Sequence, residues 1–363
     1  MNNKILILLI GNIKYDGRVK KEITSLQKFG YQVVLVCTSM DQEDSIQNYP
    51  YKIYKLNHPS GKGILDKIKN KLRFKSSISQ IITSEKPDYI HCNDSTILYV
   101  GRWIKKVKVI YDAHELLPEL EVGFRKTITR FMERRKLRHV YKVILPQIDR
   151  LNIFYFQNRD ILIKKQLFLL ENFPSKSNQI IDNYFLHKYN YQTNNKILSY
   201  VGVISNARNI YEIVEAVSKI EKMTFFIIGK GQSDYTDKIQ ELISERNIGH
   251  RVFLKEPIPN DEVISVSESS DLGICFYSDP NLNSYLCASN KLFENLNAGM
   301  AVLTNNIAGT ARIIQPGFNG YVIDDITPDQ ICKGLKQISD LSPPIPSTYY
   351  WENQEGVLKE IYQ

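Results

Sequence analysis

The sequence predicts an α/β protein built from two similar halves. Residues 4–10 form a continuous apolar run and residues 197–203, ILSYVGV, a mostly apolar one, and each is followed by a loop and then by a helical pattern. Runs of this kind are typical of central parallel strands that are buried on both faces. A chain of 363 residues is long enough for two such domains, each with its own core. We therefore expect two parallel sheets, each covered by helices.

The composition is that of an ordinary globular protein, with 43% hydrophobic and 24% charged residues. No apolar run reaches the ~18 residues of a membrane span. The first ten residues are apolar but lead into Gly11 and Asn12 rather than a cleavage site, so we do not expect a signal peptide. The five cysteines have no paired spacing, which predicts reduced thiols in a cytoplasmic protein and no metal site.

In the first half, residues 4–10 are the predicted first strand, residues 18–29 the first helix and residues 32–37 the next strand. Their connection lacks a G-x-G-x-x-G pattern, so NAD binding is not supported. It carries Asp16 and Arg18 instead, in the stretch DGRVKKE. These charges belong either to a ligand site or to an N-capped helix start with solvated side chains.

Polar residues also follow two later strands of the first half. Asn93 and Asp94 follow the predicted strand at residues 88–92, and His114 follows the predicted strand at residues 107–111, in the stretch YDAHEL. In open α/β sheets ligands bind at the carboxyl ends of the strands, which makes these residues candidates for a site. A lone histidine on a loop is weak evidence, so a structural histidine remains the alternative.

Two basic stretches stand out in the first half. Residues 61–76 and residues 124–142 both read as helices with an apolar side beside their cations. From Arg125 to Lys142 there are eight Lys or Arg and one acid, Glu133, a local +7 against the formal +8 of the chain. Two such helices predict docking on an anionic lipid surface, with two solvated helices as the alternative. No basic strand interleaved with aromatics supports binding of nucleic acid.

In the second half, residues 289–302 read SNKLFENLNAGMAV and predict a short helix that Gly299 ends. Ser289 and Asn290 suit its N-cap. Such a helix start offers free backbone N–H groups to a phosphate. Glu294, about one turn inside, has a carboxylate that suits the hydroxyls of a ribose. An ordinary surface helix with a solvated glutamate is the alternative. The apolar face of this helix comprises Leu292, Phe293, Leu296 and Met300.

NKLFENLNAGMAV, together with DGRVKKE, YDAHEL and the loop at residues 202–208, resembles the family 4 glycosyltransferases, which are retaining enzymes. The resemblance implies the GT-B fold, with two Rossmann-like domains facing across a cleft. It implies an acceptor domain at residues 1–174, a linker at 175–195 and a nucleotide-sugar donor domain at 196–345. Residues 346–363 are then a terminal helix that crosses back to the first domain.

The resemblance also implies roles for single residues. Glu294 is expected to hold the donor ribose, Arg208 to meet the donor diphosphate and His114 to lie beside the donor sugar. The expected catalytic residues are His114, Arg208 and Lys291. The expected acceptor-side residues are Asp16, Arg18, Asn93 and Asp94. The expected donor-binding residues are Gly11, Gly202, Arg208, Ser289, Asn290, Lys291, Leu292 and Glu294.

Two positions depart from the family pattern. Val203 stands where an arginine often follows the glycine, and Leu286 stands where a glutamate often precedes Glu294 by eight residues. The first departure reduces the positive charge at the diphosphate. The second removes an obvious nucleophile, so the resemblance favours front-face substitution with retention. Ser289, Asn290 and Lys291 stay open as contacts of the donor sugar or its phosphate.

The predicted function is transfer of a sugar from a nucleotide-diphosphate donor, UDP- or GDP-linked, without a metal or other cofactor. The two basic helices suggest a lipid-linked or growing-glycan acceptor, as in bacterial cell-surface polysaccharide synthesis. The protein is then expected in the cytoplasm, peripheral on the inner face of the membrane. Two alternatives stay open: a sugar-nucleotide epimerase of the same fold, and a non-catalytic donor-binding partner of another transferase.

Overall fold

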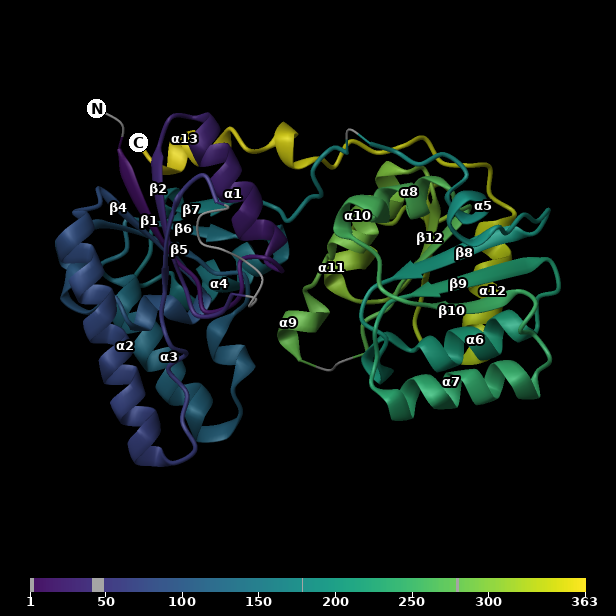
Figure 1. Cartoon of the computed structure of the whole chain (residues 1–363), viewed down its shortest axis with the longest axis horizontal. Helices are drawn as coiled ribbons and strands as arrows, with labels where there is room; N and C mark the ends of the chain where they lie inside the picture. The colour runs from purple at the N-terminus through teal and green to yellow at the C-terminus, as the bar shows by residue number, and fades with distance from the viewer. Residues whose placement is uncertain (1–2, 41–48, 178, 279–280) are drawn as a thin grey trace. The chain divides into compact units, whose positions relative to one another are not determined.

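The structure is a computed structural model that describes residues 3–40, 49–177, 179–278 and 281–363. It divides into two compact units, each described here by itself (Figure 1). Unit 1 comprises Met1–Asn172 together with Gln354–Gln363, and unit 2 comprises Phe173–Asn353.

Unit 1 contains a parallel sheet of seven strands in the order β3-β2-β1-β4-β5-β6-β7. In its centre Ile5 pairs with Val33 of one neighbour and Tyr89 of the other. The apolar run of β1 is buried, as expected for a strand covered on both faces. The strands are β1 Lys4–Leu8, β2 Gln32–Cys37, β3 Lys52–Lys55, β4 Tyr89–Asn93, β5 Lys108–Asp112, β6 Lys142–Leu145 and β7 Leu167–Leu169.

The first helix of unit 1 begins where a local signal predicts. Helix α1 begins after Asp16, whose carboxylate accepts a hydrogen bond from Val19 N at 2.9 Å. Helix α13, at the end of the chain, lies beside α1 (Figure 1). The helices are α1 Gly17–Lys28, α2 Ile64–Glu85, η2 Asp94–Leu98, η3 Gly101–Lys105, η4 Leu117–Leu120, α3 Gly123–Leu137, α4 Ile148–Asn158, η5 Lys164–Gln166 and α13 Val357–Ile361.

Unit 2 contains a parallel sheet of six strands in the order β10-β9-β8-β11-β12-β13. The strand order reverses between β8 and β11, and ligands bind beyond the carboxyl ends of strands at such a point. Its neighbouring strands pair in parallel, so the predicted second parallel sheet is confirmed. The strands are β8 Lys196–Val201, β9 Met223–Ile228, β10 Val252–Lys255, β11 Leu272–Cys275, β12 Ala301–Asn305 and β13 Gly320–Ile323.

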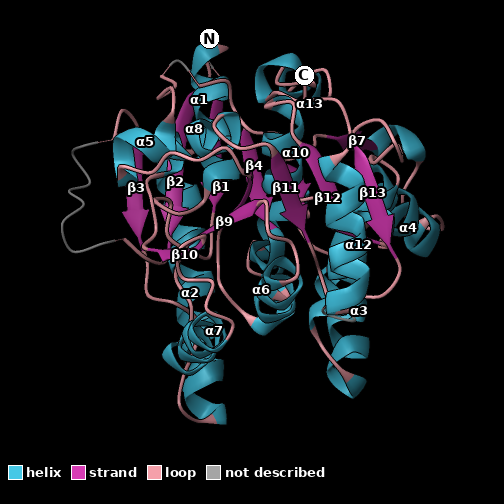
Figure 2. Cartoon of the chain, turned by 90° about the vertical axis from the view of Figure 1, so that its right-hand side faces the viewer, coloured by secondary structure: helices cyan, strands magenta, loops and turns pink. Residues whose placement is uncertain are grey.

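Helices cover both faces of the second sheet, with separate cores on each (Figure 2). Helices α6, α7 and α12 pack on one face, and α8 and α10 on the other. The helices are α5 Tyr184–Tyr189, η6 Asn206–Arg208, α6 Ile210–Ser218, α7 Ser233–Glu245, η7 Asn260–Glu262, α8 Val263–Glu268, α9 Leu282–Tyr285, α10 Asn290–Asn297, α11 Ala308–Ala311, α12 Pro328–Ser339 and η8 Trp351–Asn353.

The structure differs from the expected boundaries in two places. The stretch at 175–195, expected as a linker, lies in unit 2 and contributes α5, whose Phe185 stacks on Phe226 at 4.2 Å between ring centroids. Residue 178 of that stretch lies outside the described residues. The expected terminal helix at 346–363 is instead two short helices, η8 and α13. The first lies in unit 2, where Trp351 N donates to Pro174 O, and the second belongs to unit 1 with the rest of Gln354–Gln363. Aromatic burial at residues 184 and 185 outweighed the polar composition of the stretch.

The two basic stretches also differ from expectation. Residues 64–85 form one continuous helix, α2, and α3 ends at Leu137. Part of each apolar side faces solvent: Ile64 and Leu65 of α2 are 78% and 82% exposed, and Phe124 and Phe131 of α3 are 78% and 67% exposed. The later apolar residues of α2, such as Ile78, and Leu137 at the end of α3 are buried. Both helices therefore present apolar side chains that the core of unit 1 does not use. In the described part of the chain no helix is long and apolar enough to cross a membrane.

Candidate functional site

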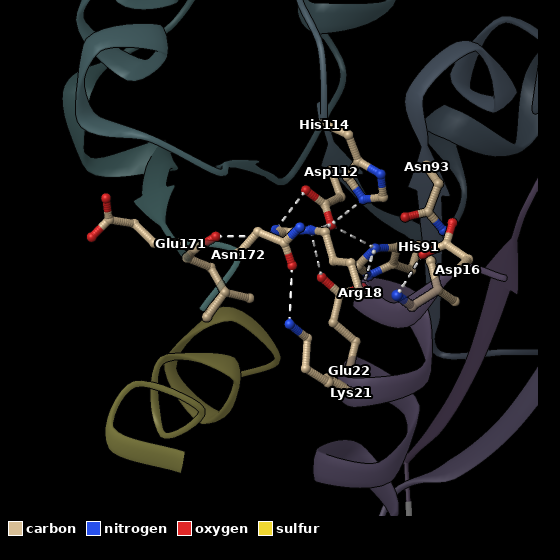
Figure 3. A network of polar contacts seen from close by, with 12 residues as sticks. Asp16, Arg18, Lys21, Glu22, His91, Asn93, Asp112, His114, Glu171 and Asn172 are labelled. Carbon is tan, nitrogen blue, oxygen red and sulfur yellow. Dashed lines mark hydrogen bonds and ion pairs between the residues drawn. The ribbon is translucent and has the colours of Figure 1, made fainter. Parts of the chain in front are cut away.

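Charged residues of unit 1 converge where β4 and β5 meet the start of α1 (Figure 3). Asp112 is the last residue of β5, and His114 follows it in the loop. His91 lies within β4. Arg18 and Glu22 are one turn apart on the buried face of α1. The sheet order places β4 next to β5, so these side chains from distant parts of the sequence meet in one cluster.

Arg18 is the centre of this cluster. Its Nε and Nη2 each donate to one oxygen of Asp112 at 3.1 Å, and its Nη1 donates to Leu170 O at 2.8 Å. Its Nε also lies 3.2 Å from Glu22 Oε1. Arg18 was expected on the acceptor side, but only 5% of its side chain is exposed. Its guanidinium is committed to internal partners, so its role here is to hold Asp112.

His114 is the exposed end of the cluster. Its Nε2 lies 3.0 Å from Asp112 Oδ2 and its Nδ1 lies 3.5 Å from Asp94 Oδ2, with 19% of the side chain exposed. Burial alone would lower the pKa of His114, but Asp112 and Asp94 outweigh burial and raise that pKa to about 9. His114 is therefore an imidazolium at neutral pH, suited to donating hydrogen bonds and not to accepting a proton.

The two carboxylates behind His114 differ in charge. Burial acts to raise the pKa of Asp112, but the cations Arg18 and His114 hold it well below its usual range. Burial and the neighbouring Asp112 charge raise the pKa of Glu22 well above its usual range. Asp112 is therefore the ionised member at neutral pH, and Glu22 is the member that holds its proton to the higher pH.

Glu22, His91 and Asp112 also form a grouping that could hold a metal ion, with one ligand atom of each within 4.8 Å of the others. Arg18 already bonds to Asp112 and lies against Glu22, so a cation meets both carboxyl groups. A metal ion at this place would have to displace or repel that guanidinium. The donor set is therefore a poor fit for a metal site.

The remaining expected acceptor-side residues fall at different depths. Asp16 caps α1. Asn93 is buried and its Nδ2 donates to Leu8 O at 3.0 Å, which ties β4 to the end of β1. Asp94 has a left-handed φ of 46° and is 35% exposed, and its Oδ1 accepts from Glu115 N at 3.2 Å. Asp16 and Asp94 are thus the members of this set that reach solvent, and Asp94 does so beside His114.

Gly11 was expected to bind donor. Its carbonyl oxygen accepts a hydrogen bond from Ser39 N at 3.1 Å, which joins the loop after β1 to the loop after β2. A Cβ added here would meet only the side chain of Leu9, at 3.6 Å, an ordinary contact. None of the unit 1 residues that the structure describes therefore requires glycine at this position.

In unit 2 a lysine and a glycine approach closely at the carboxyl end of β8. A Cβ at Gly202 would lie 2.3 Å from Lys291 Cε and 2.7 Å from its Nζ, and Gly202 has a φ of 150°. The lysine Nζ also lies over the ring of Tyr200, 5.7 Å from its centroid. Glycine at 202 therefore leaves the room in which Lys291, from the start of α10, reaches the edge of the sheet.

Arg208 is held a short distance away. Its guanidinium carbon lies 4.0 Å from the ring centroid of Tyr277, and its Nη1 donates to Phe276 O at 3.5 Å. Tyr277 follows β11, and Arg208 ends the turn η6 that follows β8. The stacking fixes a cation at the point where the strand order reverses, next to the place reached by Lys291.

The start of α10 supplies the other expected donor contacts. Ser289 takes the N-cap position without a side-chain capping bond, and its Oγ lies 3.4 Å from Cys275 Sγ. Asn290 Oδ1 is buried and accepts no hydrogen bond from any residue that the structure describes. Leu292 is wholly buried, so only its backbone can meet a ligand. Glu294 is half-buried one turn further along α10.

Two pockets open at this edge of unit 2. One of about 610 Å³ lies beside Tyr277 and includes Asn209 and Asp324. The other, of about 950 Å³, lies beside the loop at residues 203–207 and includes Tyr211 and Tyr235. Both volumes fall in the range of ligand sites, about 300–1,000 Å³. Both pockets lie at the carboxyl edge of the sheet, but neither is lined by Arg208, Lys291 or Glu294.

The two departures from the family pattern lie in different surroundings. Val203 is 66% exposed, so an apolar side chain stands at the surface beside Gly202. Leu286 is 2% exposed and belongs to the interior. A glutamate at 286 would carry a charge into that interior, whereas the leucine of this chain packs there without one.

Sequence reasoning missed Glu22, His91, Asp112 and Tyr277 as members of these sites. Glu22 follows Arg18 by four residues, a spacing that places both on one helix face. Asp112 ends an apolar run at a sheet edge, which is also a usable signal. A histidine inside an apolar strand carries no such signal, because it reads as part of the core.

Comparison with known proteins found two family models, one in each half of the chain. A model described as "Glycosyl transferase 4-like domain" matches residues 18–147. A model described as "Glycosyl transferases group 1" matches residues 185–348. No significant match to a curated protein sequence was found. The two matches together cover most of the chain, in the order that the resemblance predicted.

Solved structures resemble the whole chain. Sucrose-phosphate synthase from Thermosynechococcus elongatus has a TM-score of 0.75 at 16% identity, covering 99% of this chain and 98% of that one. Anabaena HepE in complex with UDP and glucose has a TM-score of 0.74 at 13% identity, covering 99% of each chain. A Listeria monocytogenes protein described as a candidate UDP-N-acetylglucosamine 2-epimerase has a TM-score of 0.64 at 12% identity, covering 99% and 95%. At these identities the likeness shows the fold alone, and the predicted fold is confirmed.

Proposed function

Because this chain is a glycosyltransferase of the GT-B type that resembles family 4, we propose that it transfers a sugar from a nucleotide-diphosphate donor with retention of configuration. Two cations support the donor class. Lys291 reaches past Gly202, and Arg208 is stacked on Tyr277 at the point where strand order reverses. HepE, a structural relative, was solved with UDP-glucose. We infer a UDP- or GDP-linked sugar as the donor.

The diphosphate gains negative charge as the glycosidic bond breaks, so the site must stabilise that charge in the transition state. Arg208, Lys291 and the N–H groups at the start of α10 supply positive charge and hydrogen-bond donors at one place. In this proposal these groups do the work that a metal ion does in other transferases. Glu294 accepts from the ribose hydroxyls, and the imidazolium of His114 donates to the donor sugar.

Retention follows in this proposal from attack on the same face that the leaving group departs. Leu286 is buried and apolar, so the position offers no carboxylate for a covalent intermediate. The acceptor hydroxyl would then attack beside the departing diphosphate, which takes up the proton that the hydroxyl loses. The new glycosidic bond forms at the carbon from which the diphosphate oxygen leaves.

We infer a lipid-linked or growing-glycan acceptor from the surface of unit 1. Helices α2 and α3 expose large apolar side chains beside exposed cations. An anionic bilayer fits both features, since the apolar side chains enter the interface and the cations meet the head groups. A transferase held at the inner face of the membrane would meet the carrier-linked glycans of bacterial cell-surface polysaccharide synthesis.

A thermal-shift screen of nucleotide sugars tests the donor proposal, because a ligand that binds only the folded protein raises its melting temperature. We expect UDP- or GDP-sugars to raise it, and the stabilising donor to lose affinity in the Glu294→Ala variant. The loss should be roughly 1.5–3 kcal/mol in calorimetry, as for a hydrogen bond to a charged group. Unchanged donor affinity in that variant would remove Glu294 from the ribose site.

A sugar-nucleotide epimerase is the second candidate, because one structural relative carries that description. An epimerase converts the donor without an acceptor. NMR spectra of UDP-glucose and UDP-N-acetylglucosamine incubated with the protein separate the two reactions. Release of UDP with a free sugar supports the transferase, whereas a second nucleotide sugar supports the epimerase. A donor that binds and stays intact supports the remaining alternative, a non-catalytic donor-binding partner of another transferase.

A further inference from the structure

We propose that Tyr362, the penultimate residue of the chain, is a positioning residue that acts on His114 through His91 and Asp112. The inference rests on the proposed function, in which His114 works at the donor sugar. In this proposal Tyr362 fixes the tautomer and orientation of the buried His91. The Nε2 of His91 lies 3.6 Å from the carboxylate to which His114 is bonded, without a hydrogen bond to any residue that the structure describes.

The first link is a short hydrogen bond between Tyr362 and His91. The Tyr362 hydroxyl lies 2.5 Å from His91 Nδ1, and both side chains are buried. Burial raises the pKa of Tyr362 well above its usual value, and the nearby Glu22 and Asp112 add to this effect. The hydroxyl therefore keeps its proton and can donate it to Nδ1.

The second link joins His91 to the carboxyl groups. His91 Nε2 lies 3.4 Å from Glu22 Oε2 and 3.6 Å from Asp112 Oδ2. The negative charge of Asp112 favours a proton on Nε2, which leaves Nδ1 as the acceptor for Tyr362. A hydrogen bond to one imidazole nitrogen selects which nitrogen carries the proton, so Tyr362 directs an N–H group toward Asp112 and Glu22.

The third link is the contact of Asp112 with His114. Asp112 is bonded by Arg18, faced by His91 and bonded by His114, whose Nε2 lies at 3.0 Å (Figure 3). Arg18, His91 and Asp112 are almost wholly buried, and His114 is the member that reaches solvent. Loss of the Tyr362 hydroxyl therefore acts on the exposed part of the cluster by changing the orientation of the His114 ring.

The surroundings of Tyr362 make a clean test possible. Its ring packs against Tyr89 at 5.2 Å, Tyr31 at 5.6 Å and His91 at 6.3 Å between ring centroids. Phenylalanine keeps these ring contacts, so Tyr362→Phe removes the hydroxyl alone. Tyr89→Phe is the matched control, because it removes a buried hydroxyl from the same aromatic group, one that accepts from Lys108 Nζ at 3.4 Å.

The kinetic experiment follows UDP release from UDP-glucose by the full-length protein. For Tyr362→Phe we expect kcat to fall roughly tenfold with KM for UDP-glucose little changed, as for loss of a group that orients a working residue. The melting temperature should change as little as in Tyr89→Phe, and Tyr89→Phe should keep its kcat. An unchanged kcat in Tyr362→Phe, or an equal fall in both variants, would overturn the proposal.

A double-mutant cycle separates action through His114 from a general loss of packing. In the His114→Gln background, Tyr362→Phe should lower kcat no further, because the residue it acts through is gone. Multiplicative losses in the double variant would instead show that the two residues act independently, which contradicts the positioning role.

If the wild-type protein does not turn over UDP-glucose, UDP-glucose is the wrong donor, and the contacts from Tyr362 to His114 are untouched by that result. A spectroscopic measurement then decides the proposal. Nitrogen NMR of histidine-labelled protein, with His91→Gln to assign the signals, reports which nitrogen carries the proton. We expect protonated Nε2 in the wild type and a mixture of tautomers in Tyr362→Phe. A proton on Nδ1 in the wild type, or the same spectrum in both proteins, would overturn the inference.

Discussion

Two residues of unit 2 bring positive charge to the edge of one sheet. Lys291 reaches that edge because Gly202 has no side chain, and Arg208 is fixed by the ring of Tyr277. Neither cation is held there by a carboxylate in the contacts described above. Each is therefore placed to meet a ligand anion without first giving up an ion pair.

Arg208→Ala and Lys291→Ala should each lower kcat more than they weaken donor binding. The diphosphate is more negative in the transition state than in the bound donor, so a lost cation costs more during reaction. We expect a fall in kcat of roughly 10²-fold for each, the usual effect of removing one preorganised donor. Steady-state UDP release and donor calorimetry measure the two effects. Lys333→Ala, which removes an exposed cation of α12 that lines neither pocket, is the control.

His114 gives a pH-dependent contribution to stability. Its pKa is raised to about 9 in the folded protein, above the ordinary value near 6.5. A raised pKa stabilises the fold fully below the unfolded pKa, and this contribution is lost as pH rises through about 9. Its upper limit is about 3 kcal/mol, from 1.36 kcal/mol per unit of pKa shift.

We therefore expect the wild type to be more stable than His114→Gln at about pH 6, and the difference in stability between the two proteins to shrink toward about pH 10. Melting temperatures of both proteins across this range measure it. A difference that grows with rising pH would contradict the cationic state of His114. It would indicate that the histidine is neutral in the folded protein.

At the scale of elements, α3 combines exposed apolar and basic residues on one helix. Phe124 and Phe131 are exposed, as are Arg125, Arg135 and Arg138. Arg134 is different, because it donates to Gln157 O and pairs with Asp160. A charge change at Arg134 would disturb the fold of unit 1, so it is a poor probe of membrane binding.

Flotation with liposomes tests the membrane role of α3. Binding should rise with the fraction of anionic lipid and fall with salt. It should fall when Arg125, Arg135 and Arg138 become glutamate, since each cation near an anionic surface contributes about 1 kcal/mol. Phe124→Ser with Phe131→Ser should also weaken it, whereas Phe318→Ser, an exposed phenylalanine of unit 2, should not. Equal recovery with neutral and anionic liposomes would leave α3 as a solvated helix.

At the scale of the whole molecule, the chain leaves unit 1 after Asn172 and returns to it at Gln354. The two crossing points are joined within unit 1, where Glu171 N donates to Gln354 Oε1 at 2.9 Å and the Gln354 amide donates back to Glu171 O. Glu355 then accepts from Ser25 at 2.6 Å and pairs with Lys28, both on α1. The last ten residues are thus an integral part of unit 1.

Deletion of residues 354–363 should destabilise the protein strongly. Leu358, Ile361 and Tyr362 are almost fully buried, and each such side chain contributes about 1.5–3 kcal/mol. The expected loss is therefore roughly 5 kcal/mol or more, read as a lower melting temperature in calorimetry. Deletion of exposed Gln363 alone is the control. An unchanged melting temperature after the longer deletion would mean that the tail does not pack on unit 1 in solution.

The sequence by itself predicted the central strands of each sheet, several of the helices around them, and the edge of each sheet where polar residues gather. Apolar runs identify strands buried on both faces, so residues 4–10 and 197–203 already predicted two parallel sheets. The residues that follow a strand are fixed by chain order, which is why Asp94, His114 and Arg208 could be placed at sheet edges in advance. The start of α10 was readable for the same reason, since capping and apolar spacing are local.

Only the tertiary structure decided which of these charges are buried and what they contact. Arg18, His91, Asp112 and Tyr362 meet because sheet order and the returning chain bring four distant segments together, and no local period links them. The same holds for the apolar sides of α2 and α3, whose spacing alone predicts a covered face as readily as an exposed one. Burial depends on which elements fill the remaining space, and that is a property of the packed chain and not of any single stretch.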